Sequence, residues 1–78
     1  MEMNYRVIVR FSITKEVNEQ YFATLEESES LALYLDCALE NSASLGYVIQ
    51  ERKPNGEILT VNENGDYVGK WTGLSWDA

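Results

Sequence analysis

The stretch Tyr47–Thr72 most constrains the fold, because two glycine-containing turns divide it into three short segments of β-forming residues. The two turns are Lys53-Pro54-Asn55-Gly56 and Asn62-Glu63-Asn64-Gly65. Each fits a type I turn closed by a bulge, in which glycine takes the positive φ that other residues resist. The stretch therefore predicts a three-stranded antiparallel meander.

The two turns also predict which side chains share a face of the meander. The expected register sets Lys53 opposite Glu57, Glu51 opposite Leu59, Ile49 opposite Val61, and Val61 opposite Tyr67. The face toward the core is expected to carry Tyr47, Ile49, Leu59, Val61, Tyr67, Gly69 and Trp71. The outer face is expected to carry Val48, Gln50, Arg52, Ile58, Thr60, Val68 and Lys70. Both turns give the same apolar face, so the two assignments support each other.

Alternation of apolar and polar residues predicts a long strand over Asn4–Thr14. One of its faces carries Tyr5, Val7, Val9, Phe11 and Ile13, and the other carries Arg6, Ile8, Arg10 and Ser12. The polar segment Lys15–Glu19 predicts a loop. Gln20–Thr24 then predicts a shorter strand, with Tyr21 toward the core and Phe22 on the outer face.

An amphipathic helix is predicted between this strand and the meander. Thr24 with Glu27 can cap its start, and Ser28 is the alternative cap. Leu45 extends the helix if the last turn holds, and Gly46 suits the left-handed residue beyond its end. The expected apolar stripe is Leu31, Tyr34, Leu35, Ala38 and Leu39. The opposite side carries Glu29, Leu33, Asp36 and Glu40.

These elements predict an α+β fold, a two-layer sandwich of a five-stranded antiparallel sheet with one helix packed on one face. The chain order is β-β-α-β-β-β, and the expected strand order in the sheet is 2-1-3-4-5. Residues 1–78 are expected to form a single domain, with residues 73–78 as a possible flexible tail. Trp76 either folds back on the core or stays free.

Charge and composition exclude several classes of function. The net charge is −7, from 13 acidic and 6 basic residues, and this opposes general binding to nucleic acid or to anionic membranes.

No apolar run approaches the length of a membrane span, and no secretory signal pattern opens the chain. One cysteine excludes an internal disulfide. The expected location is the cytoplasm.

No residue pattern in the sequence predicts catalysis or a cofactor. The chain has no histidine, so the usual general base at neutral pH is missing. Acidic neighbours disfavour a thiolate at Cys37. The segment Asn62–Gly65 is similar to part of a calcium loop, but Thr60 and Trp71 would occupy the first and twelfth ligand positions, where carboxylates are required. The sequence therefore predicts a binding protein, not an enzyme, with no metal.

Two surfaces are candidates for binding a partner, which is expected to be another protein or a second copy of the chain. The first is the outer sheet face, where bases surround aliphatic side chains. Its predicted residues are Arg6, Ile8, Arg10, Val48, Arg52, Ile58, Val68 and Lys70. The alternative is that this face binds no partner and is a solvated sheet surface, on which the long basic side chains cover the aliphatic ones.

The second candidate surface is the acidic side of the helix. Eight acidic residues and no Lys or Arg occur from Glu16 to Glu51. The predicted contact residues are Glu26, Glu29, Leu33, Asp36 and Glu40. Such a surface could imitate nucleic acid against a basic partner, as an inhibitor or immunity protein of the phage or mobile-element type would. A single-stranded nucleic-acid reader is disfavoured, since only Phe22 offers an outward aromatic side chain.

Overall fold

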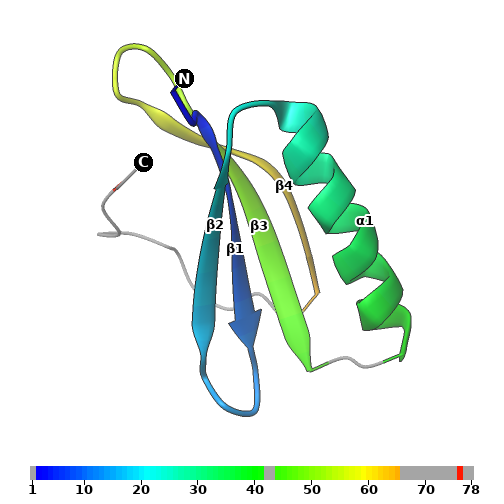
Figure 1. Ribbon diagram of the computed structural model, residues 1–78. Helices are drawn as coiled ribbons and strands as arrows, with labels where there is room; N and C mark the ends of the chain where they lie inside the picture. The colour runs from blue at the N-terminus through cyan, green and yellow to red at the C-terminus, as the bar shows by residue number, and fades with distance from the viewer. Residues whose placement is uncertain (1, 42–43, 66–75, 77–78) are drawn as a thin grey trace.

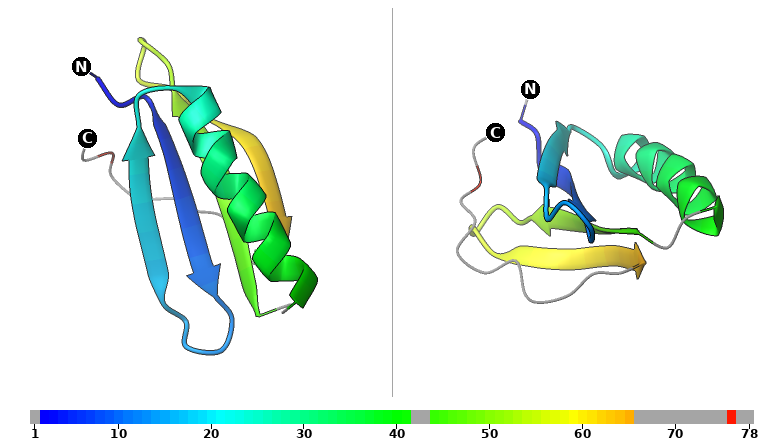
Figure 2. Two further views of the ribbon diagram at one scale, coloured as in Figure 1. Left: turned by 45° about the vertical axis from the view of Figure 1, so that its right-hand side comes forward. Right: turned by 90° about the horizontal axis from the view of Figure 1, so that it is seen from below.

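The computed structural model describes residues 2–41, 44–65 and 76. Four strands and one helix follow in the order β1 (Tyr5–Phe11), β2 (Val17–Phe22), α1 (Leu25–Asn41), β3 (Leu45–Arg52) and β4 (Ile58–Gly65). The strands form one antiparallel sheet with the order β2-β1-β3-β4 (Figure 1). α1 covers one face of this sheet (Figure 2). The antiparallel α+β arrangement confirms the predicted class, with four strands rather than five. The predicted fifth strand, after Gly65, lies outside the described residues.

The first predicted turn is confirmed by its hydrogen bonds. The Gly56 amide donates to the Lys53 carbonyl at 2.9 Å, and the Lys53 amide donates to the Glu57 carbonyl at 2.7 Å. Gly56 has a φ of 89°, as the bulge requires. The side chain of Asn55 also accepts from the Glu57 amide at 3.0 Å. Glu51 then lies opposite Leu59, as predicted.

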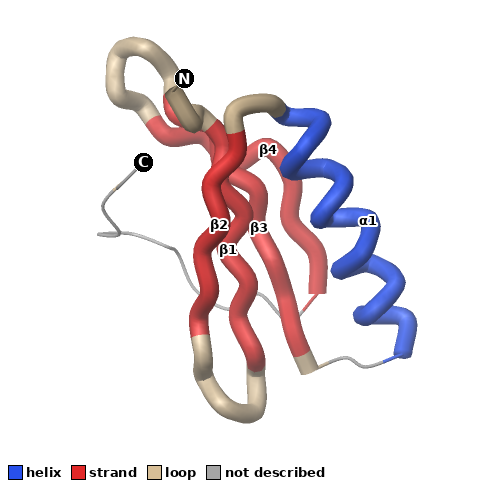
Figure 3. The backbone as a smooth tube through the Cα atoms, viewed as in Figure 1, coloured by secondary structure: helices blue, strands red, loops and turns tan. Residues whose placement is uncertain are grey.

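The second predicted turn is wrong, because Asn62–Gly65 continues β4 (Figure 3). The register shifts between Ile49 and Gln50, so that Ile49 lies opposite Asn62 and not opposite Val61. This irregularity lets β4 remain paired with β3 as far as Gly46. A glycine-containing segment that resembles a turn thus forms the end of a strand, where tertiary pairing overrides the local preference.

The β1–β2 hairpin also differs from its prediction. β1 ends at Phe11, and Ile13, predicted on the core face, is 81% exposed in the loop. β2 begins at Val17, within the segment predicted as a loop. Its register sets Tyr21 opposite Arg6 and Phe22 opposite Tyr5, so Phe22 faces the core and Tyr21 faces outward. A loop is present as predicted, but it lies earlier than Lys15–Glu19, between Phe11 and Val17. It contains no glycine to mark its position, and Lys15 itself takes the positive φ of 64°.

The core lies between α1 and the central strands. Its buried residues are Val7, Val9, Ala32, Leu35, Leu45, Tyr47 and Ile49. The predicted cap is confirmed, because the Glu27 amide donates to Thr24 Oγ1 at 3.3 Å. Ser28 is fully buried, and its hydroxyl donates to the Leu25 carbonyl at 2.7 Å. Small side chains at Ser28 and Ala32 therefore face the sheet along α1.

Three predicted features of the helix and its core are wrong. Tyr34 is the one member of the predicted apolar stripe that is mostly exposed, at 71%. Leu35 is buried as predicted, the remaining members pack against the core, and Ala32 rather than Tyr34 completes the line of contact. The helix ends at Asn41, and Leu45 belongs to β3. Leu59 and Val61 are 39% and 40% exposed, because α1 packs on β1, β2 and β3 and leaves β4 largely uncovered.

Candidate protein-interaction surfaces

The outer sheet face is less accessible than predicted. The exposed fractions of Arg6, Ile8 and Val48 are 1%, 0% and 0%, so none of these side chains can contact a partner in this conformation. Arg10 and Arg52 are half-buried, and Ile58 is 38% exposed. Val68 and Lys70 lie outside the described residues. The prediction that Ile8 and Val48 are exposed aliphatics is therefore wrong.

Trp76 packs on this outer face. Its indole ring lies 4.8 Å from the guanidinium carbon of Arg6 and 5.1 Å from that of Arg52, measured to the ring centroid. The ring of Tyr21 meets it edge-on, with 5.6 Å between centroids. The indole N–H donates to the Met3 carbonyl at 3.1 Å. Neither predicted alternative for Trp76 holds, because the ring is not free and packs on the outer face of the sheet rather than on the core.

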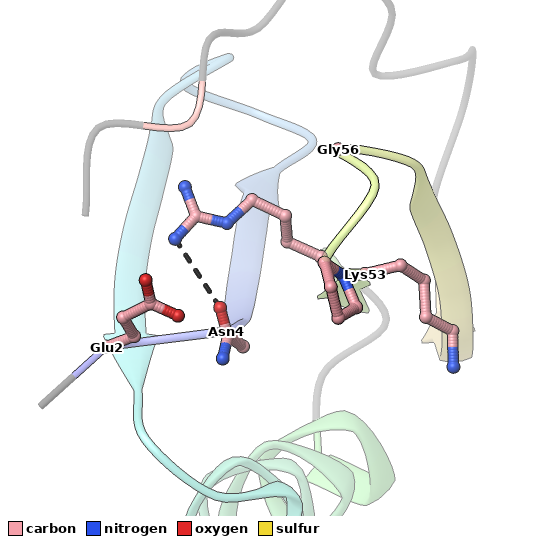
Figure 4. A pocket seen from close by; sticks show the side chains of 6 residues that line it. Glu2, Asn4, Lys53 and Gly56 are labelled. Carbon is pink, nitrogen blue, oxygen red and sulfur yellow. Dashed lines mark hydrogen bonds between the residues drawn. The ribbon is translucent and has the colours of Figure 1, made fainter.

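The side chains of Arg52 and Lys53 both line a hollow at the surface, but they do not converge on a common point (Figure 4). Arg52 Nη2 donates to Asn4 Oδ1 at 3.4 Å, whereas the Lys53 side chain extends in another direction and pairs with Glu51 at 3.3 Å. The acidic side chain of Glu2 also lines the hollow. Because the two basic side chains point in different directions and an acidic side chain lines the same hollow, its lining does not favour an anion.

The helix presents a different surface, which we call the α1 outer face. It consists of Glu26, Glu29, Leu33, Tyr34, Cys37 and Glu40. Leu33 is 67% exposed, and three of the acids stand four or seven residues away from it, so that they surround it on the same side of the helix. Tyr34, also mostly exposed, extends the apolar centre. The predicted residues Glu26, Glu29, Leu33 and Glu40 are thus brought together.

The acids of the α1 outer face are available to a partner. Among the described residues, the carboxylates of Glu26, Glu29 and Glu40 form no ion pair or hydrogen bond, since the ion pair found there joins Lys53 to Glu51. The last turn of α1 contains no base, although the partial negative charge of a helix C-terminus favours one. Glu40 therefore stands where it destabilises the helix slightly.

Asp36 differs from the other predicted acids, because its carboxylate already has partners. Oδ1 accepts a hydrogen bond from the Tyr47 hydroxyl at 2.8 Å and another from Asn64 Nδ2 at 2.8 Å. These bonds join α1 to β3 and β4. Burial, and then the hydrogen bond to Asp36 and its charge, raise the pKa of Tyr47 to about 12. The role of Asp36 in this structure is to anchor the helix.

The anchor could not be read from the sequence. Asp36 and Asn64 are 28 residues apart, and the Asn-Gly pair that begins at Asn64 predicts a turn rather than the end of a strand.

The described residues contain no group of three or more His, Cys, Asp and Glu that could hold a metal ion. In the same part of the chain, no helix is long and apolar enough to cross a membrane.

Comparisons of the chain with protein-family models, with curated proteins and with solved structures found no match.

Proposed function

We propose that the protein is a non-catalytic binding domain that uses its α1 outer face to recognise a basic protein partner. The observation that carries the proposal is the exposure of Leu33 and Tyr34 in the middle of the helix, 67% and 71%, among acids without partners. An apolar centre with a charged rim is the usual composition of a protein interface. This ranks the helix above the outer sheet face, where Arg6, Ile8 and Val48 are buried.

The charge of α1 supports a basic partner over a second copy of the chain. The helix carries five acids and no base, Glu26, Glu27, Glu29, Asp36 and Glu40. Two such helices placed face to face would bring like charges together as Leu33 becomes desolvated, which opposes a homodimer at this surface. A partner with Lys or Arg residues around an apolar recess would instead be attracted by the negative charge of the helix, and its bases would face the acids around Leu33.

Affinity capture from the source cell with paired variants tests the proposal. Leu33→Asp changes an exposed side chain, so the fold should persist while the partner is lost from the eluate. Ile13→Asp is the matched control, because Ile13 is 81% exposed in the β1–β2 loop and should leave capture unchanged. Equal capture by wild type, Leu33→Asp and Ile13→Asp would remove the α1 outer face from consideration.

A second candidate function is inhibition by imitation of nucleic acid. The observation that favours it is the row of unpaired carboxylates at Glu26, Glu29 and Glu40 along one side of α1. Binding of this kind weakens steeply with salt and is competed by DNA or RNA. The combination Glu29→Lys with Glu40→Lys reverses two of these charges and should abolish binding to the basic partner. Asp36→Lys is unsuitable, because it would break the bonds to Tyr47 and Asn64. Capture that resists both salt and nucleic acid would exclude imitation.

A further inference from the structure

The contacts of Trp76 define a second recognition site, on the opposite side of the sheet from α1. Among the described residues, four hold the indole: the Met3 carbonyl accepts its N–H, Arg6 and Arg52 place guanidinium groups on the ring, and Tyr21 meets it edge-on. We call these residues the indole cradle. A hydrogen-bond acceptor combined with cationic and aromatic contacts fits an indole better than a phenyl ring or an aliphatic side chain.

The cradle is held in place by bonds that do not involve Trp76. Arg6 Nε donates to Gln50 Oε1 at 2.9 Å, Arg52 Nη2 to Asn4 Oδ1 at 3.4 Å, and the Tyr21 hydroxyl to Glu19 Oε2 at 2.8 Å. The bonds to Gln50, Asn4 and Glu19 thus position the side chains that receive the ring, and on this basis the site should keep its shape when the ring leaves.

Trp76 can leave without opening the core. It is half-buried, its bond to Met3 lies at an exposed site, and it does not belong to the buried cluster beneath α1. Residues 66–75 connect it to the end of β4. Because Trp76 belongs to the same chain as the cradle, a partner must supply additional contacts to take its place.

We propose that the indole cradle is a binding site for a tryptophan side chain, filled by Trp76 in the isolated chain and by a tryptophan-bearing segment of another protein in a complex. Exchange of Trp76 between two copies of the chain would reproduce the same contacts and add none to offset the cost of association. A different protein can add contacts from residues flanking its tryptophan. The site is independent of the α1 outer face.

Titration of the full-length Trp76→Ala variant with N-acetyl-tryptophanamide tests this site. NMR signals of the Arg6 and Arg52 Nε–H groups and of the Tyr21 ring should shift saturably at millimolar ligand, whereas the same signals in wild type should not respond. The N1-methyl derivative, which cannot donate to the Met3 carbonyl, should bind about fivefold more weakly. Adding Arg52→Gln to the variant should weaken binding roughly two- to fivefold. Lys53→Gln is the control, since Lys53 extends away from Arg52 (Figure 4).

Two results would overturn the proposal. One is a folded Trp76→Ala variant whose signals do not saturate. The other is equal binding by wild type and variant, which would place the ligand elsewhere. If Trp76→Ala does not fold alone, the same titration is followed by circular dichroism. Recovery of the folded signal with the ligand supports the cradle, and no recovery contradicts it. Neither result bears on the capture experiments with Leu33→Asp.

Discussion

At Gly65, one missing Cβ decides whether the end of β4 can lie against β3. The residue has a φ of 87°, and a Cβ there would lie 2.5 Å from the Leu45 carbonyl oxygen and 2.9 Å from a methyl carbon of Leu39. Gly56 has a similar φ of 89°, but a Cβ there would meet nothing within 4 Å. Substitutions at these two glycines therefore distinguish the free-energy cost of a positive φ from the cost of steric overlap with neighbouring atoms.

Gly65→Ala should lower the free energy of unfolding by roughly 2–4 kcal/mol, because backbone strain and steric overlap add. Gly56→Ala should cost only about 1–2 kcal/mol, the price of a left-handed conformation alone. Urea denaturation of the two variants and wild type measures the difference. If Gly65→Ala costs no more than Gly56→Ala, the close approach of β4 to Leu45 and Leu39 is not as described.

The side chain of Tyr47 connects the buried core to the Asp36 carboxylate of α1. Its ring is buried, and its hydroxyl donates to Asp36 at 2.8 Å. Removing the hydroxyl in Tyr47→Phe should cost about 1–3 kcal/mol near neutral pH, because it leaves Asp36 with one fewer donor. Thermal unfolding measures this, and Tyr34→Phe is the control because Tyr34 is 71% exposed.

The raised pKa of Tyr47 also predicts how stability depends on alkaline pH. The folded-state pKa is about 12, above the value of about 10 in an unfolded chain, so the folded protein retains a proton that the unfolded chain loses. This contribution is fully present below pH about 10 and disappears as pH rises through about 12. The pKa of Tyr5 is raised as well, by burial and by Glu51, so Tyr47→Phe should show a smaller alkaline loss and not its absence. An unchanged loss would contradict the assignment.

At the scale of the elements, the acidic residues of α1 interact favourably with the helix dipole in the first turn and unfavourably near the last turn. Glu26 lies in the first turn, near the positive end of the helix dipole, and Glu40 lies near the negative end. Glu26→Gln should therefore lower stability by about 0.3–1 kcal/mol, and Glu40→Gln should raise it by a similar amount. Thermal unfolding at low salt measures both changes, and high salt should reduce them. Changes of the same sign in both variants would refute this account.

Sequence patterns predicted the elements where local and tertiary preferences agree. β1, the cap at Thr24 and the turn at Gly56 each combine a local signal with a matching position in the sheet. The class of fold and the strand order as far as β4 followed from these. The turn expected at Asn62–Gly65 failed because a shift in register near Ile49 keeps that segment paired with β3.

The candidate sites were harder to predict than the fold. Helical spacing correctly grouped Glu26, Glu29, Leu33 and Glu40, since positions along one helix have fixed directions. It could not show that Asp36 is bonded to residues far along the chain, or that Tyr34 is exposed. Alternation likewise placed Arg6, Ile8 and Val48 on the outer face correctly. It could not show that they are buried there, because burial depends on what packs over a strand.

At the scale of the whole molecule, one sheet separates two different chemistries. α1 lies on one face of the sheet (Figure 2). Its exposed acids and Leu33 are turned away from the sheet, while the opposite face holds Trp76 against Arg6 and Arg52. A single partner that meets the α1 outer face cannot at the same time contact the indole cradle unless it wraps around an edge of the sheet. Each surface can therefore be tested with the other left intact.

An NMR map of the complex with the captured partner tests the central claim most directly. The α1 outer face predicts that shifts and protection concentrate at Leu33, Tyr34 and Cys37, with Glu29 and Glu40 at the rim. The Ile13 loop should stay unchanged. Changes centred on Arg52 and Ile58, with Leu33 and Tyr34 unaffected, would contradict the proposal and show that the partner binds the outer sheet face.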